Sequence, residues 1–432
     1  MPAGLAARLA AEQAVSEMLA TGRALDDFFA ATSLSPRLAG LDPRDRALAR
    51  SIATVTARRL GSLRKLIAAR LERGLPKKSG ALEATLLIGA AQLLFMNAPD
   101  HAVVDLAVRA IKRDPKIAAF AGLANAVLRG LARGRDDAVA GLDPLNDDAP
   151  AWLAARWRKT YGEAGARAIA AAHAQEHPLD LTVKNDAQGW AERLGGVVLP
   201  TGSVRLLTHA PVTELEGYED GQWWVQDAAA ALPARLLAVQ PGERVADLCA
   251  APGGKTAQLC AAGASVVAVD RSAERLKRLA ANLDRLGFVA ETAVADAASF
   301  EAPPFDAILL DAPCSATGTI RRHPDVAWSK TLADVASLAE VQARLLDHAW
   351  TLLKPGGTLV YATCSLEQEE GEQQIRAFLA RHAEARLRPV LAAEIGGLEA
   401  MTSAEGFLRV LPCHLAGIGG ADGFFAARLT KS

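Results

Sequence analysis

The spacing of apolar residues divides the chain into a helical first part and a strand-rich last part. Within residues 1–133 apolar side chains recur every three or four positions, as at Val104, Val108 and Ile111. This period places them on one face of a helix. The segment LDPRDRALAR at 41–50 adds an aspartate followed by a proline, a pair typical of a helix start. The pattern predicts an all-helical region.

From about residue 231 the pattern changes to short apolar runs that alternate with amphipathic segments. The runs are rich in β-branched residues and bounded by turn residues, which is typical of buried strands. They read RVADLC, SVVAVD, ETAVADA, DAILL and TLVYAT, and two further runs near FLRVLP and GFFAARL follow. Strands that alternate with helices in this way predict an α/β fold, a mostly parallel sheet with helices on both faces.

Two segments of different character lie between these regions. Residues 136–150 are rich in Gly, Pro, Asp and Asn and lack periodicity, so they are predicted to form a linker. Residues 151–230 begin with a helical pattern and continue with short strand-like pieces such as LDLTVKN. We expect them to form a small α+β subdomain. The remaining domains are then an all-α domain at 1–135 and a catalytic domain at 231–432.

Length and composition narrow the class of protein. The chain has 432 residues and a mass of 45.3 kDa, enough for two or three domains with their own cores. No charge-free apolar run reaches the roughly 18 residues that span a bilayer, and the N-terminus reads as an amphipathic helix. Five cysteines without a CxxC pair or a Cys/His cluster favour neither a disulfide framework nor a zinc site. We expect a cytoplasmic monomer with no membrane or metal partner.

The distribution of charge is more informative than its total. The net charge is −1, yet residues 1–135 hold 21 Lys and Arg against 11 Asp and Glu, whereas the rest holds 27 against 38. A basic module joined to an acidic body is expected if the first part contacts phosphates, and RNA is the expected partner. Solvated helix faces are the alternative for any single side chain. The basic residues that cluster are Arg44, Arg46, Arg50, Arg58, Arg59, Arg64, Lys65, Arg70, Arg73, Lys112, Arg113 and Lys116.

A glycine-rich turn after the first strand of the α/β region indicates a cofactor site. DLCAAPGGKT at 247–256 lacks both GxGxxG and the GxxxxGK[ST] of a phosphate-binding loop. Acids follow later strands at Asp270, placed to accept hydrogen bonds from a ribose, and at Asp296, placed to meet an adenine edge. Because these acids occur without an arginine that could bind phosphates, they favour S-adenosylmethionine over NAD. The alternative is that the glycines simply form a turn between strand and helix. The expected cofactor contacts are Cys249, Ala250, Ala251, Pro252, Gly253, Gly254, Lys255, Asp270, Asp296 and Asp311.

Two cysteines each follow a predicted strand rather than lying inside it. Cys314 belongs to DAPCS at 311–315 and Cys364 to TCS at 363–365. Carboxyl strand ends are where open α/β sheets bind ligands, so both thiols are expected at the cofactor site. A redox disulfide between them is an alternative that a reducing cytosol disfavours. The other three cysteines, Cys249, Cys260 and Cys413, are expected to be small buried hydrophobic residues, although Cys249 also falls in the cofactor turn.

Four strings together carry a family resemblance. DLCAAPGGKT, DAPCSATGTIRRHPDV, YATCSLEQEE and DGFFAARL resemble, in order and spacing, the RNA cytosine-5 methyltransferases of the Rsm/Nop/Sun group. The resemblance is close over about 150–432. The basic helical front resembles the NusB-type RNA-binding domain of the RsmB-like members, whose target is a cytidine of small-subunit 16S ribosomal RNA, of the cytosine-967 class. It implies a class I, Rossmann-like methyltransferase domain with a seven-stranded, mostly parallel sheet. A NusB-like domain and the α+β subdomain at 151–230, which is then expected to bind RNA, precede it.

The chemistry of the family assigns roles to residues. Carbon 5 of cytosine is a poor nucleophile, so a thiolate must first add to carbon 6. The Pro313–Cys314 pair looks like the nucleophile motif of DNA cytosine methyltransferases, and the residues alone do not rank the two cysteines. The resemblance implies that Cys364 attacks and that Cys314 assists product release. Asp311 is expected to face ring nitrogen N3, and Lys255 to orient either that acid or the methionine carboxylate.

Other activities remain open from the sequence. A non-catalytic RNA-binding assembly factor could keep the fold, but both cysteines and the three acids argue against it. A DNA methyltransferase lacks support because no target-recognition domain follows the Pro-Cys loop. A relative that acts on tRNA or on another ribosomal site is a third alternative. Arg321, Arg322 and His323 could hold phosphates of the target strand near the site, or form a solvated loop.

Overall fold

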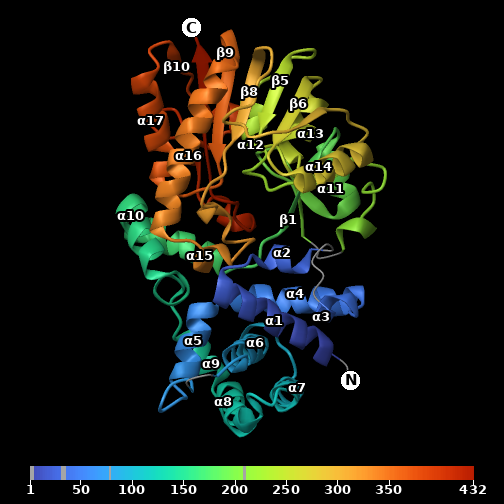
Figure 1. Cartoon of the computed structure of the whole chain (residues 1–432), viewed down its shortest axis with the longest axis vertical. Coiled ribbons are helices and arrows are strands. Elements are labelled where there is room, and N and C mark those ends of the chain that lie inside the picture. The colour runs from blue at the N-terminus through green and yellow to red at the C-terminus, as the bar shows by residue number, and fades with distance from the viewer. Residues whose placement is uncertain (1–3, 31–35, 77–78, 208–210) are drawn as a thin grey trace. The chain divides into compact units, whose positions relative to one another are not determined.

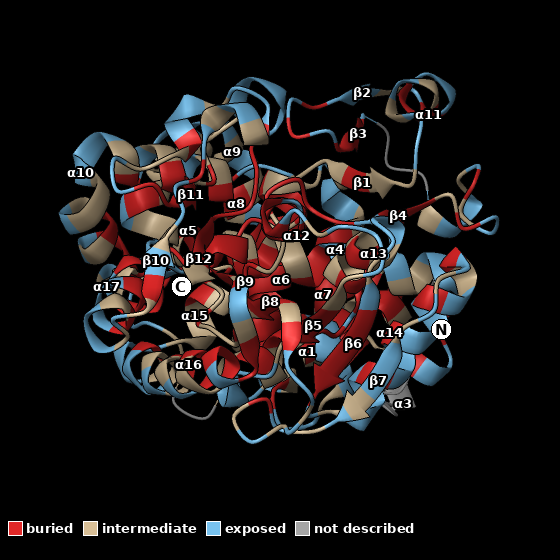
Figure 2. Ribbon diagram, turned by 90° about the horizontal axis from the view of Figure 1, so that it is seen from above, coloured by how far each residue is buried: buried red, intermediate tan, exposed pale blue. Residues whose placement is uncertain are grey.

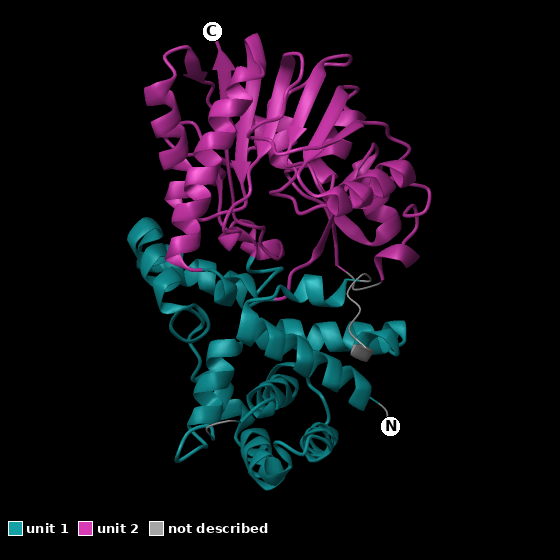
Figure 3. Ribbon diagram, in the orientation of Figure 1, with its two compact units in different colours: residues 1–175, 320–330 teal, residues 176–319, 331–432 magenta. Residues whose placement is uncertain are grey.

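The computed structural model describes residues 4–30, 36–76, 79–207 and 211–432, and the chain forms two compact units. Unit 1 consists of residues 1–175 and 320–330, and unit 2 of residues 176–319 and 331–432 (Figure 3). Unit 1 is helical (Figure 1). Its α-helices in the described residues are α1 (Leu5–Thr21), α2 (Leu25–Phe29), α3 (Pro36–Ala39), α4 (Pro43–Arg58), α5 (Leu60–Ala68), α6 (Leu82–Phe95), α7 (Asp100–Arg113), α8 (Ala121–Arg133), α9 (Arg135–Ala140), α10 (Ala151–His173) and α15 (Val326–Ser329).

The helices of unit 1 begin and pack as their sequence predicts. Helix α4 starts at Pro43, and the Asp42 side chain caps it by accepting a hydrogen bond from the Asp45 backbone N–H at 2.7 Å. Helix α6 is buried on nearly every side, because α1, α4, α5, α7 and α8 all contact it. An apolar helix of this kind forms the centre of a helical bundle. The all-helical expectation for the first part of the chain is confirmed.

Unit 2 contains two sheets. The smaller sheet has the order β2-β3-β1-β4, with all pairs antiparallel, and helix α11 (Ala187–Leu194) packs against it. Its buried residues include Trp190 and Trp223, which form one apolar cluster with Leu181 and Val204. The strands are β1 (Leu179–Val183), β2 (Gly196–Val198), β3 (Val204–Leu206) and β4 (Trp223–Val225).

The larger sheet has eight strands in the described part of the chain, in the order β10-β12-β9-β8-β5-β6-β7, with β11 paired to β12. The five strands from β9 to β7 are parallel, and β12 runs antiparallel to β9. The strands are β5 (Arg244–Leu248), β6 (Ser265–Asp270), β7 (Glu291–Val294), β8 (Phe305–Asp311), β9 (Leu353–Thr363), β10 (Ala385–Leu387), β11 (Leu408–Val410) and β12 (Phe424–Lys431). The chain order reverses beside β5, which creates the crevice where such sheets bind ligands.

Helices cover both faces of the larger sheet. Alternate residues of β8 point to opposite faces, so Ile308 and Leu310 join one core while Ala307 and Leu309 join the other. The first core is closed by α16 (Leu332–Thr351) and α17 (Glu372–Arg381), and the second by α12 (Leu232–Leu237) and α13 (Gly254–Ala261). Helix α14 (Ala273–Leu286) packs beside β6 and β7. Most central residues of the sheet are buried on both faces (Figure 2).

The domain limits differ from those expected from the sequence. Helix α10 belongs to unit 1 rather than to the α+β subdomain, and the expected linker contains α9 and a π-helical turn at Pro144–Asp148. The turn is held because the Ser62 backbone N–H donates to Asp148 at 2.8 Å. The small and large sheets fall in one compact unit with no division at residue 231. The sheet also has one strand more than expected, since the short β10 lacks a clear apolar run.

Candidate active site

The two predicted cysteines meet at the carboxyl ends of neighbouring parallel strands. Strands β8 and β9 pair with Asp311 opposite Ala362, so the turns that follow them begin at the same edge. The Sγ atoms of Cys314 and Cys364 lie 3.5 Å apart. The Gly318 backbone N–H donates to the Cys364 carbonyl at 3.0 Å, which ties one turn to the other. The two turns therefore bring the thiols together at one edge of the sheet, and their place at a cofactor site stays a prediction.

The environment of Cys314 favours its protonated form. A hydrogen bond to Cys364, followed by burial and the nearby Cys364 and Glu370 charges, raises the pKa of Cys314 well above its usual range. Cys314 therefore holds its proton. Burial likewise raises the pKa of Cys249 to about 12 and that of Cys260 to about 11. All five cysteines are free and part-buried, so those outside the pair are less enclosed than expected.

Asp311 and Lys255 form an ion pair beside the thiols. Lys255 Nζ lies 2.7 Å from Asp311 Oδ2, and both side chains are largely buried. Burial lowers the pKa of Lys255, but Asp311, then Asp247 and Cys364, outweigh it and hold the pKa above its usual value. The ammonium also lies 5.1 Å from the centre of the Phe424 ring. Of the two roles expected for Lys255, contact with Asp311 is the one that this geometry displays.

The glycine-rich turn and the strand-end acids line the adjoining edge of the sheet. Asp270 is buried at the end of β6 and accepts from the backbone N–H groups of Ala251 at 3.2 Å and Ser272 at 2.9 Å. These bonds join the turn after β5 to the end of β6. Arg275 approaches Asp270 within 3.2 Å. Asp296 lies two residues beyond β7, is exposed, and accepts from the Ala298 backbone N–H at 2.9 Å.

Gly253 is the position of this turn that a side chain would damage most. Its φ is +101°, and an added Cβ would lie 2.7 Å from Leu279 Cγ. We expect Gly253→Ala to lower the free energy of unfolding by roughly 1–3 kcal/mol, because the residue would be both strained and overpacked. Gly254→Ala is the matched control, since its Cβ would meet Gln226 at an ordinary 3.5 Å. Urea unfolding of both variants measures the difference, and equal losses would contradict it.

Asp247 is a buried acid that sequence analysis did not single out. Its Oδ2 accepts from the Thr256 hydroxyl at 2.6 Å, and its buried Oδ1 has no partner. Burial raises the pKa of Asp247 to about 7, with Asp311 and Asp270 adding to the rise and Thr256 and Lys255 opposing it. A signal existed in the sequence, because an acid within an apolar strand is uncommon.

The raised pKa of Asp247 predicts a pH-dependent loss of stability. Between about pH 4 and pH 7 the folded chain keeps a proton that the unfolded chain releases. The stability that this proton confers is full below pH 4 and is lost as the pH rises through about 7. Asp247→Asn is expected to flatten that decline. Urea unfolding at several pH values from 4 to 8 tests this, and parallel curves for the two proteins would refute it.

Glu370 is a second residue that sequence analysis missed. It lies in the short helical turn Gln368–Glu370 after Cys364 and is fully buried. Its carboxylate accepts hydrogen bonds from Ser315, Ser365 and Gln342. The string LEQEE looks like a solvated acidic turn, so the sequence carried no signal that one of its acids is enclosed.

The segment after the Cys314 turn belongs to unit 1. Trp328 Nε1 donates to the Ala57 carbonyl at 2.9 Å, and His323 lies 3.1 Å from Asp26 and lowers the pKa of that carboxyl to about 2. Arg321 is 1 % exposed, so the expectation that it offers a surface cation to phosphates is wrong for this residue. The Arg321 backbone carbonyl accepts a hydrogen bond from Arg58 of α4 at 3.2 Å.

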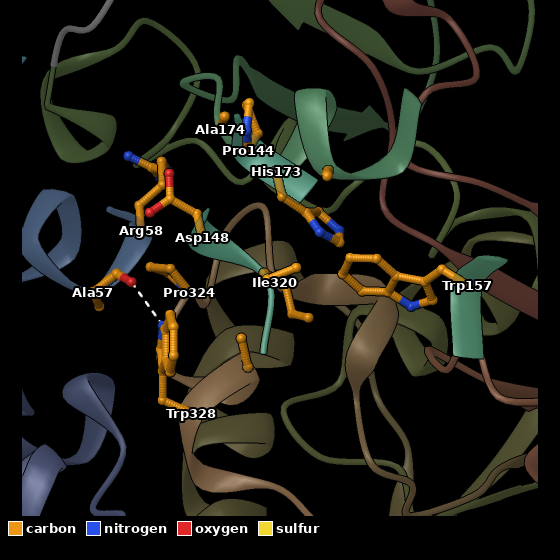
Figure 4. A pocket seen from close by; sticks show the side chains of 13 residues that line it. Ala57, Arg58, Pro144, Asp148, Trp157, His173, Ala174, Ile320, Pro324 and Trp328 are labelled. Atoms are coloured by element: carbon orange, nitrogen blue, oxygen red, sulfur yellow. Dashed lines mark hydrogen bonds between the residues drawn. The ribbon is translucent and has the colours of Figure 1, made fainter. Parts of the chain in front are cut away.

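A small pocket of about 20 Å³ adjoins this segment (Figure 4). Residues of α4, α10 and the 320–330 segment line it, among them Trp157 and His173. Burial, together with the charges of Arg321 and Arg58, lowers the pKa of His173 to about 3. The neutral His173 imidazole lines a cavity about the size of one water molecule, so we assign it to packing within unit 1 rather than to catalysis.

The basic residues of unit 1 are partly neutralised by ion pairs. Four of the predicted cations pair with acids of the same unit: Arg50 with Asp26, Arg59 with Asp148, Arg64 with Glu83 and Lys65 with Asp147. Lys112, Arg113 and Lys116 are exposed at the end of α7 and in the turn that follows. In the described residues no helix is long and apolar enough to cross a membrane, and no cluster of three metal-ligating side chains was found.

The sheet order and the turn after the first strand define a class I, Rossmann-like methyltransferase fold. The chain belongs to the RsmB/F family of 16S rRNA methyltransferases. The family model "16S rRNA methyltransferase RsmB/F" matches residues 234–430, and the NusB family matches residues 5–133. Ribosomal RNA small subunit methyltransferase B of Cronobacter sakazakii is 36 % identical over 448 residues, and that of Vibrio cholerae 37 % over 443. These alignments cover 98 % of this chain and at least 97 % of each relative.

Solved structures support the same fold. The crystal structure of PH0851 superposes with a TM-score of 0.75 over the whole chain and 99 % of its own, at 24 % identity. A methyltransferase homologue from Pyrococcus horikoshii, 30 % identical, has a TM-score of 0.56 over 65 % of this chain and 95 % of its own. The family resemblance inferred from the four sequence strings is therefore confirmed, and so is the fold class.

Proposed function

We propose that this protein transfers a methyl group from S-adenosylmethionine to carbon 5 of a cytidine in 16S ribosomal RNA. The observation that carries the proposal is the pair of thiols 3.5 Å apart at the edge of a methyltransferase sheet, beside the Lys255–Asp311 pair. Methyl transfer to most other atoms needs no thiol, whereas carbon 5 of cytosine must first be activated by a nucleophile. The names of the curated relatives favour small-subunit ribosomal RNA as the substrate. The cytosine-967 class of site is the target we expect.

The residues of the turn suit an adenosyl cofactor. Asp247 offers a buried oxygen without a partner, and Gly253 keeps the turn free of a side chain. Asp270 and Asp296 follow the next two strands, where a ribose and an adenine edge are expected to bind. The residues that would hold the cofactor are those of 249–255 together with Asp270, Asp296 and Asp311. When bound, it supplies an electrophilic methyl group.

In the proposed reaction each residue has a distinct part. The Cys364 thiolate forms a bond to cytosine carbon 6, and the ring electrons move toward N3. N3 takes up a proton from solvent, and Asp311, which faces N3, stabilises that proton while Lys255 orients the Asp311 carboxylate. Carbon 5 then accepts the methyl group. Solvent then accepts the carbon 5 proton, the double bond between carbons 5 and 6 re-forms and expels the Cys364 thiolate, and N3 returns its proton to solvent. Cys314, which keeps its own proton, assists this release by donating a hydrogen bond to the leaving sulfur.

Unit 1 is proposed to bind RNA, with the exposed end of α7 as its phosphate-contacting part. Lys112, Arg113 and Lys116 supply that charge. The target cytidine must be unstacked to reach the thiols, so a loop or junction is the expected site, methylated in the cytoplasm. The experiment that tests the function is nucleoside mass spectrometry of 16S ribosomal RNA incubated with enzyme and cofactor. 5-Methylcytidine in this RNA supports it; methylation of tRNA alone, or binding without methylation, would overturn it.

A further inference from the structure

Glu370 is a buried carboxylate that contacts both cysteine turns. Its Oε1 accepts from the Ser315 backbone N–H at 2.8 Å, and its Oε2 accepts from the Ser315 hydroxyl. Oε2 also accepts from the Ser365 hydroxyl at 2.5 Å. Ser315 follows Cys314 and Ser365 follows Cys364, so a single side chain holds the residue next to each thiol. The two serine Oγ atoms themselves lie 3.2 Å apart.

A fourth donor completes the set around Glu370. Gln342 of α16 donates from Nε2 to Glu370 Oε1 at 3.0 Å and to the Pro313 carbonyl at 2.9 Å. Its Oε1 accepts from the Tyr361 hydroxyl at 3.1 Å, which fixes the orientation of the amide. A carboxylate has about four acceptor positions, and four donors fill them here. The side chain is therefore fixed in position by hydrogen bonds to both of its oxygens.

Glu370 is also anchored to the strand that carries Cys364. Its backbone carbonyl accepts from the Tyr361 hydroxyl at 2.9 Å and from the Thr363 hydroxyl at 3.2 Å, and both residues belong to β9. Arg409 adds a bond to the Ser365 carbonyl at 2.5 Å. Glu370 is thus fixed to β9 on one side and holds the turn after β8 on the other.

The charges around the thiol pair are arranged unequally. Glu370 and Tyr361 lie close enough to Cys314 to interact with it electrostatically, while the Lys255 ammonium, itself paired with Asp311, interacts with Cys364. A negative charge near Cys314 disfavours a thiolate there, so the pKa of Cys314 is raised. A thiol proton placed on Cys314 can point at the Cys364 sulfur, 3.5 Å away.

We propose that Glu370 is a positioning residue for the two-cysteine reaction. It fixes the turns of Cys314 and Cys364 to one another and keeps the shared proton on Cys314, so that Cys364 is the sulfur free to attack. The inference rests on the proposed function for its catalytic consequence. Its electrostatic part concerns the protein alone and can be tested without RNA.

The test compares how fast iodoacetamide alkylates Cys314 at different pH values, read by peptide mass spectrometry. All variants are made in a Cys364→Ala protein, so that Cys314 is the one cysteine of the pair that iodoacetamide can alkylate. Adding Glu370→Gln is expected to move the alkylation midpoint of Cys314 to lower pH, because the neighbouring anion is gone. Adding Glu394→Gln is the matched control, since Glu394 pairs with Arg428 in the same unit outside the cysteine turns. An unchanged Cys314 midpoint in a folded Glu370→Gln protein would overturn the proposal.

Catalysis supplies the second readout. In the otherwise native protein, Glu370→Gln is expected to slow single-turnover methyl transfer on the order of a hundredfold, with cofactor affinity nearly unchanged, because small displacements of reacting groups have effects of this size. If this variant does not fold, Ser315→Ala and Ser365→Ala each remove one donor to the same oxygen. Their effects on the rate should be less than additive, since both act through Glu370. Native rates in both serine variants would overturn the proposal.

The outcomes separate this inference from the proposed function. If the native enzyme makes no 5-methylcytidine, the proposed function is wrong. The alkylation profiles still show in that case whether Glu370 controls the Cys314 proton. Conversely, the native enzyme could make 5-methylcytidine while Glu370→Gln leaves the alkylation profile of Cys314 unaltered. That result would support the proposed function and contradict the role proposed for Glu370.

Discussion

Cys364→Ala is expected to abolish methyl transfer, and Cys314→Ala to trap the enzyme on its RNA. Loss of an attacking nucleophile typically lowers a rate by roughly four orders of magnitude or more. Without Cys364 no bond to carbon 6 forms, so no covalent complex appears. Without Cys314 the bond forms but release is slow, so a protein–RNA adduct accumulates. A denaturing gel of each variant with 16S ribosomal RNA and cofactor displays the adduct as a band of reduced mobility.

The control for this experiment is Cys260→Ala. Cys260 lies in α13, and its thiol contacts the Val289 carbonyl at 3.6 Å, away from the thiol pair. This variant should methylate RNA as the native protein does and leave no adduct. The inverse pattern, with an adduct in Cys364→Ala and none in Cys314→Ala, would make the Pro-Cys turn the nucleophile. Although the raised pKa of Cys314 argues against that assignment, the gel decides it directly.

The local parts of the fold could be predicted from the sequence because local pattern determines them. Strand β6 occupies Ser265–Asp270, the residues of the SVVAVD run, and Asp42 caps α4 as its position before a proline indicated. The apolar runs of β8 and β9 predicted that each of the two cysteines follows a strand end, and the two strands are neighbours in the sheet. Helix periodicity and strand alternation are properties of short windows, so a single sequence reveals them.

The features that escaped prediction depend on contacts between distant residues. Glu370 reaches Ser315, which lies 55 positions away, and nothing in LEQEE distinguishes a buried acid from an exposed one. Residues 320–330 follow the Cys314 turn in sequence but pack with unit 1, because Trp328 and His323 find partners on the early helices. Helix α10 has an amphipathic pattern that fits either unit. Tertiary packing determines which unit such a segment joins, and a short stretch of sequence carries no information about that packing.

Asp311→Asn is expected to lower the rate of methyl transfer by roughly 10²–10⁴-fold, with little change in RNA affinity. The proposed function requires a carboxylate at N3 when Cys364 adds to the ring, and general acid–base groups contribute about this much. An amide keeps the size of the side chain but carries no charge to stabilise a protonated N3. Single-turnover transfer of a labelled methyl group, measured with saturating cofactor, gives the rate.

The same strand offers a matched control for that variant. Asp306, also in β8, pairs with Lys354 at 2.6 Å, as Asp311 pairs with Lys255 at 2.7 Å, but it lies at the opposite end of the strand. Asp306→Asn should therefore leave the rate unchanged. Lys255→Met separates the two roles considered for the lysine: a lower kcat with an unchanged cofactor KM supports orientation of Asp311, whereas a raised KM alone assigns Lys255 to the cofactor. If Asp311→Asn transfers the methyl group as fast as Asp306→Asn does, Asp311 takes no part in the chemistry.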